Sequence, residues 1–88
     1  MNKFIPQEIE KLNNGLTRVV PVLASFDGAG SIKPLYVRIN EESYRILSCY
    51  ATTYGPLTMY RCKVSSYGRE KELNLTYHSR ERCWTTQL

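Results

Sequence analysis

Residues 57–78 constrain the fold of this 88-residue chain most, because apolar side chains occupy every second position on two arms around a turn. This alternation predicts two strands with one buried face and one face in solvent. The turn at residues 65–68, Ser-Ser-Tyr-Gly, favours a reversal between antiparallel strands. The residues predicted to point inward are Tyr60, Cys62 and Val64 on the first arm and Leu73, Leu75 and Tyr77 on the second.

Shorter alternating segments predict further strands on both sides of this hairpin. One covers residues 17–26, where Pro21 lacks an amide hydrogen and therefore indicates a sheet edge or a bulge. The others are predicted at residues 35–39, 44–50 and 82–86, and a tight turn before the last would set Trp84 opposite Leu75. On these strands we expect Leu47 and Cys49 to point outward, and the inward residues to be Val20, Val22, Ala24, Phe26, Leu35, Val37, Ile39, Tyr44, Ile46 and Ser48.

The N-terminal residues 4–14 have the pattern of a short amphipathic helix that ends at Gly15. Its apolar stripe either covers the sheet, which we favour, or pairs with a second copy in a homodimer. The predicted fold is therefore α+β and mainly β. A short N-terminal helix precedes an antiparallel meander of five or six strands over residues 17–87, curled into a small roll or open barrel. The stripe consists of Ile5, Ile9, Leu12 and Leu16.

Length and composition limit the class of protein. A chain of 88 residues supports a single domain, residues 1–88. It has no apolar run of membrane-spanning length and no secretion signal at its start, so we expect a cytoplasmic protein with no membrane partner. Three cysteines are too few and too scattered for a disulfide framework. The formal net charge of +4 permits an acidic partner without requiring one.

A cluster of cations is predicted on the outward face of the sheet. If neighbouring strands pair as their inward residues require, the basic face comprises four cations and one aromatic ring. Such a face suits phosphates and a stacked base, and it equally suits an acidic protein surface. The plainer interpretation is a solvated sheet face that Glu70 and Glu72 partly neutralise. The basic face consists of Tyr36, Arg38, Arg45, Arg61 and Lys63.

Residues with chemical reactivity form no recognisable catalytic or metal-binding motif. The spacing of the three cysteines and His78 lacks the close ligand pairs typical of structural zinc sites, so we expect no metal and no cofactor. Nothing around His78 indicates an acid–base pair. Cys49 and Cys62 lie at equal distances from Gly55 and Pro56, so a register that set them face to face would allow a disulfide. The alternative is two separate, buried or half-buried thiols.

These observations predict a small non-enzymatic binding protein whose basic face binds an acidic partner, either an acidic protein surface or nucleic acid. The alternative is a stoichiometric protein inhibitor or adaptor, of the kind carried by phages and mobile elements, acting by protein contact on a target such as a nucleic-acid enzyme. That alternative would use strand pairing at the sheet edge formed by residues 17–26. An enzyme is the hypothesis that the residues favour least.

Overall fold

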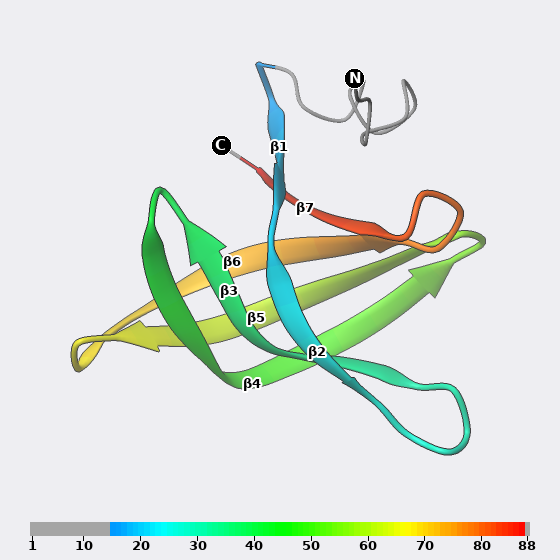
Figure 1. Ribbon diagram of the computed structural model, residues 1–88, viewed down its shortest axis with the longest axis horizontal. Helices are drawn as coiled ribbons and strands as arrows, with labels where there is room; N and C mark the ends of the chain where they lie inside the picture. The colour runs from blue at the N-terminus through cyan, green and yellow to red at the C-terminus, as the bar shows by residue number, and fades with distance from the viewer. Residues whose placement is uncertain (1–14, 88) are drawn as a thin grey trace, which may run out of the picture.

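The computed structural model describes residues 15–87, which form an all-antiparallel sheet of seven strands (Figure 1). The predicted helix at residues 4–14 lies outside the described residues. Within residues 15–87, no helix is long and apolar enough to cross a membrane. The strands are β1 (Thr17–Val20), β2 (Val22–Phe26), β3 (Ile32–Ile39), β4 (Glu42–Tyr54), β5 (Leu57–Ser66), β6 (Arg69–His78) and β7 (Cys83–Gln87).

The sheet is a curled meander in which the order of strands is β1-β7-β6-β5-β4-β3-β2. The strands at its two ends, β1 and β2, follow one another directly in sequence, separated by Pro21. This single bent segment pairs with β7 before the proline and with β3 after it. The prediction that the segment containing Pro21 lies at a sheet edge is confirmed, since β1 and β2 are the end strands of the sheet. The proline also interrupts the segment, which was not predicted. It divides residues 17–26 into two strands, so the meander has seven strands rather than five or six.

Two-residue turns connect β3 to β4, β4 to β5, and β5 to β6. Tyr67 and Gly68 have φ values of 52° and 80°, the positive pair that a type I′ hairpin requires. Gly55 has a φ of 56° and precedes Pro56, as in a type II′ turn with glycine at its first central position. The turns at residues 55–56 and 67–68 match the right-handed twist of the strands. They fix the register of the β4–β5 and β5–β6 hairpins, starting from the residue pair that closes each turn.

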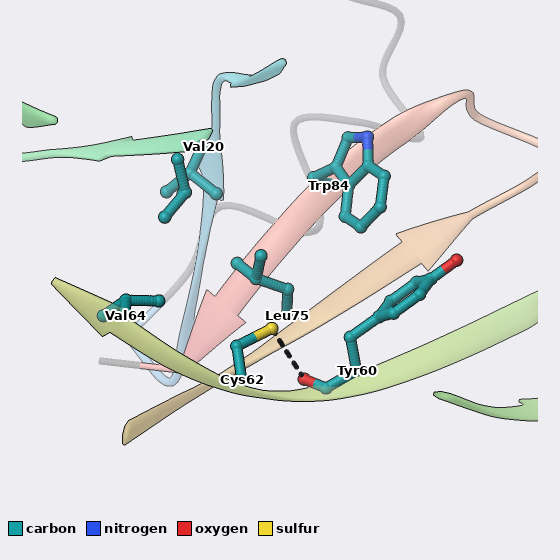
Figure 2. Close-up of a cluster of buried hydrophobic side chains, with 7 residues drawn as sticks. Val20, Tyr60, Cys62, Val64, Leu75 and Trp84 are labelled. Atoms are coloured by element: carbon teal, nitrogen blue, oxygen red, sulfur yellow. Dashed lines mark hydrogen bonds between the residues drawn. The ribbon is translucent and has the colours of Figure 1, made fainter. Parts of the chain in front are cut away.

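The core lies on the concave face of the curled sheet, and aromatic rings dominate one side of it (Figure 2). The ring of Trp84 lies 5.3 Å from that of Tyr60 and 5.0 Å from that of Tyr77, centroid to centroid. The Tyr60 hydroxyl donates a 2.6 Å hydrogen bond to the Ile32 carbonyl oxygen, which satisfies its polar atom. The prediction that Val37, Ile46, Val64 and Leu73 share one face is confirmed, since all four belong to this core or pack against it. The buried apolar side chains are Val20, Val37, Tyr60, Cys62, Val64, Leu75 and Trp84.

A bulge in β4 overturns part of the predicted alternation. The pairing of β4 with β5 shifts between Ile46 and Ser48, so one extra residue is accommodated there. Beyond that point the inward and outward positions exchange. Ser48, expected inward, is exposed, whereas Cys49, expected outward, packs against the core. Leu47 is exposed, as expected.

A second bulge, between Leu23 and Ala24 in the pairing of β2 with β3, changes the core contribution of β3. Pro34, rather than Leu35, has the fully buried side chain. Phe26 was also expected inward, but it is 67% exposed. It is the last residue of β2, and the β2–β3 hairpin projects beyond the rest of the sheet at this end (Figure 1).

The register of the last strand also differs from the prediction. Trp84 lies opposite Tyr77, and Leu75 lies opposite Thr86. The connection is a four-residue turn at residues 79–82, in which the Arg82 amide donates a 2.7 Å hydrogen bond to the His78 carbonyl oxygen. Its extra length, relative to a tight turn, moves Trp84 by two positions and places it between two tyrosine rings.

Candidate binding face

The basic face predicted from the sequence lies on the convex side of the sheet, opposite the core. Its five residues are distributed over β3, β4 and β5, and all of their side chains are exposed. On β5 the outward positions, Arg61 and Lys63, alternate with Tyr60, Cys62 and Val64, which are buried in the core. The strands therefore hold these cations away from the core by simple alternation.

The pairing of the strands brings these side chains into one diagonal stripe. Tyr36 on β3 is the direct cross-strand partner of Arg45 on β4. Arg45 in turn lies opposite Ser65, two residues from Lys63 along β5, so Arg45 and Lys63 are diagonal neighbours. Arg61 follows at the next outward position of β5, and Arg38, opposite Ser43, extends the stripe at the other end.

The cations of this stripe have no ionic partner within the described chain. Among residues 15–87 the ion pair is Arg69 with Glu42, 3.9 Å between nitrogen and oxygen, and it involves none of the four cations. The acidic residues on β6 border the stripe on one side, with Glu72 opposite Lys63 and Glu70 opposite Ser65. The stripe is therefore a row of exposed positive charges with an acidic boundary, and its charges are available to an external anion.

The structure adds a residue to this face that the sequence prediction did not include. Tyr50 on β4 is the cross-strand partner of Arg61, and its side chain is 79% exposed. It repeats the arrangement at the other end of the stripe, where Tyr36 is 45% exposed beside Arg45. The sequence did contain a feature from which the position of Tyr50 could have been predicted. A two-residue turn at Gly55 and Pro56 sets residues 50, 52 and 54 opposite residues 61, 59 and 57. This position was missed because Cys49 was predicted to point outward, and strict alternation then assigns the next residue, Tyr50, to the inner face.

A groove of about 590 Å³ adjoins this second tyrosine on the same face. Tyr50, Tyr54, Leu57 and Met59 line it from the β4–β5 hairpin, and residues of β6 and β7 line its other side. Tyr50, Tyr54 and Met59 are all exposed apolar side chains. The groove therefore offers aromatic and thioether surface directly beside Arg61.

The far side of the groove contains His78, the chain's one histidine. Its Nε2 lies 2.9 Å from the hydroxyl of Thr85, a residue that is itself buried. Burial lowers the pKa of His78 from its ordinary value of 6.5, and this effect exceeds the opposing influence of Glu81. The imidazole is therefore neutral at neutral pH and acts as a hydrogen-bonding wall of the groove. Within residues 15–87 no group of three His, Cys, Asp or Glu side chains could hold a metal ion.

Comparisons with other proteins assign no family to this arrangement. No family model matches the sequence, and neither the curated proteins nor the solved structures contain a match to it. The arguments about function therefore rest on the geometry of the chain.

Proposed function

We propose that this chain is a non-enzymatic binding protein that holds single-stranded nucleic acid across its convex face. The observation that supports the proposal is a repeated arrangement: two exposed tyrosines, each directly beside an arginine on the neighbouring strand, with Lys63 between the two pairs. The pairs are Tyr36 with Arg45 and Tyr50 with Arg61.

This combination provides two interactions that single strands use. Exposed aromatic rings stack on unpaired bases, at about 1–3 kcal/mol for each base, and tolerate any sequence. Arginine and lysine bind the phosphates, which releases counterions and makes the affinity depend on salt. An acidic protein surface would engage the cations but does not require a ring beside each arginine, whereas a single strand uses both. A single strand therefore accounts for more of the face than an acidic protein does.

The test uses the full chain and a fluorescein-labelled DNA or RNA strand of about 20 nucleotides, a length that spans a typical single-strand site. Fluorescence polarisation is measured over a series of salt concentrations. We expect binding that weakens linearly in log–log coordinates, with a slope of about −0.7 for each phosphate contacted. The double variant Arg45→Glu with Arg61→Glu should bind at least about tenfold more weakly, because two attractive contacts become repulsive.

A matched control keeps the change in net charge the same. Arg80 and Arg82 are both exposed and lie in the turn between β6 and β7, away from the stripe. The variant Arg80→Glu with Arg82→Glu should retain most of the affinity. Equal losses in the two double variants would show that net charge alone attracts the strand. No binding by the unaltered chain, or equal binding to polyglutamate, would overturn the proposal.

A second candidate function, that of a stoichiometric inhibitor or adaptor, is supported by an open sheet edge. β4 pairs with β5 as far as Tyr54, but it pairs with β3 only from Glu42 to Arg45. Within residues 15–87 no strand pairs with the other edge of residues 46–54. Besides the predicted edge at residues 17–26, where β1 and β2 are the end strands of the sheet, this edge is one that a strand of a partner protein could extend.

Backbone geometry gives a sharp test of this second candidate. Counting from the closing pair Tyr54–Leu57, the amide of Ala51 points away from β5, toward the open edge. The variant Ala51→Pro should therefore preserve the sheet while removing a donor that an added strand needs. A protein partner from a lysate that survives nuclease and high salt, and is lost with Ala51→Pro but not with Ala51→Ser, would support strand addition. Retention with both variants would exclude it.

A further inference from the structure

Two of the three cysteines are direct neighbours across the β4–β5 hairpin. Cys49 on β4 and Cys62 on β5 are register partners. The β4 bulge creates this juxtaposition, because it turns Cys49 to the inner face of the sheet, where Cys62 already lies. Cys83 is at the start of β7, opposite His78, and its outward position separates it from this pair.

The backbone at this pair has the geometry that a cross-strand disulfide needs. The closing pair of a two-residue hairpin is hydrogen bonded, and hydrogen-bonded and non-hydrogen-bonded pairs then alternate along the strands. Counting from Tyr54–Leu57, the pair Cys49–Cys62 is non-hydrogen-bonded. The Cα atoms of such pairs lie about 4.5 Å apart, within the range of about 4.4–6.8 Å found for disulfides. The side chains of such pairs also approach each other most closely.

The surroundings give the two thiols different roles. Cys62 is 1% exposed, and its Sγ lies 3.7 Å from the Tyr60 carbonyl oxygen (Figure 2). Burial, with a smaller contribution from the neighbouring Cys49, raises the pKa of Cys62 to about 12. Cys49 is half-buried and lies on the open edge of β4. A reagent therefore reaches Cys49 first, and Cys62 is positioned to react with whatever forms there.

We propose that Cys49 and Cys62 are a redox-active pair that forms an intramolecular disulfide with a low-molecular-weight disulfide such as oxidised glutathione. The Cys49 thiolate attacks one sulfur of the reagent, whose S–S bond breaks and releases one glutathione thiolate. Cys62 then gives up its proton and attacks the Cys49 sulfur, which expels the second glutathione thiolate. The two protons from the protein go to the two glutathione molecules. Two protein thiols are oxidised and one reagent disulfide is reduced.

The cross-link would join β4 and β5 next to the Tyr50–Arg61 pair, since Tyr50 follows Cys49 and Arg61 precedes Cys62. A bond between these strands restricts the unfolded chain and holds the hairpin in its native register. We therefore expect the oxidised protein to have a higher Tm than the reduced protein. This inference does not depend on the nature of the partner that the convex face binds.

The experiment exposes the reduced, full-length chain to oxidised glutathione, blocks remaining thiols with N-ethylmaleimide, and measures the intact mass and the tryptic peptides. We expect the oxidised protein to lose about 2 Da, the mass of two hydrogens, and to take up N-ethylmaleimide at one remaining thiol, that of Cys83. Trypsin should then release Cys62–Lys63 linked to the peptide of residues 46–61, because cleavage follows Arg45, Arg61 and Lys63. The same linked peptide should appear in the Cys83→Ser variant.

The linked peptide can be sought in the unaltered chain, so the test does not depend on whether a core variant folds. A disulfide that includes Cys83, or a glutathione adduct on Cys49 that persists without reaction at Cys62, would overturn the proposal. A thiol pair that stays reduced under these conditions would also overturn it. As a further check, Cys49→Ser should abolish the loss of two hydrogens and leave the Tm insensitive to oxidant.

Discussion

The two faces of β5 are made of adjacent residues in opposite surroundings. Tyr60, Cys62 and Val64 face the core and are almost completely buried, whereas Arg61 and Lys63 on the other side are exposed. The inner residues fit against Leu75 and Trp84, so packing explains their identity. On the outer face the solvent imposes no such requirement. The repeated placing of tyrosine beside arginine there is the observation on which the proposed binding of a single strand rests.

The largest expected effect lies on the inner face. Leu75 is fully buried, and Leu75→Ala should destabilise the protein by about 2–5 kcal/mol because it leaves a cavity among well-packed neighbours. Urea unfolding measured by the fluorescence of Trp84, the chain's one tryptophan, would report the change. The control is Leu47→Ala, since Leu47 is exposed at the β4 bulge. Comparable losses in both variants would contradict the distinction between the two faces.

A smaller effect, on binding rather than stability, is expected on the outer face. Tyr50→Ala should weaken the binding of a single strand by about 1–3 kcal/mol, the contribution of one stacked base, and should hardly change the free energy of unfolding. Tyr67→Ala is the matched control, because Tyr67 is 91% exposed but lies in the β5–β6 turn. Polarisation with a labelled oligonucleotide measures both variants. If the two lose affinity equally, Tyr50 has no specific place in the site.

The smallest effect concerns His78, at the boundary between the groove and the buried Thr85. Because burial lowers the pKa of His78 in the folded chain, the unfolded chain takes up a proton first as the pH falls. The neutral His78 imidazole therefore makes its full contribution to the free energy of unfolding above the ordinary pKa of 6.5. This contribution is lost as the pH falls below that value. Urea midpoints at about pH 7.5 and about pH 5.5 should differ less in His78→Gln than in the unaltered chain. An unchanged difference would mean that other groups cause the pH dependence.

The sequence predicted the five residues of the basic face, and the register of the strands aligns them as a diagonal stripe. Their outward positions follow from local alternation, which depends on the chain alone within each strand. Tyr50 was missed because a single extra residue in β4 reverses the two faces beyond it. The bulge leaves no clear mark in the alternation along β4, since Ser48 and Cys49, the two residues that follow it, are both small.

Local sequence patterns are enough to specify the β5–β6 hairpin and its inward residues, because alternation and turn chemistry are local properties. The sequence also indicated that residues 17–26 lie at a sheet edge or carry a bulge, since proline cannot donate to a ladder wherever it occurs. The division of this segment into two strands at Pro21 was not predicted. Tertiary structure decided the joining of the two sheet ends in one bent segment, the two bulges, and the meeting of Cys49 with Cys62. These features depend on which strands must pack around a common core, and curvature of the whole sheet sets where an extra residue fits.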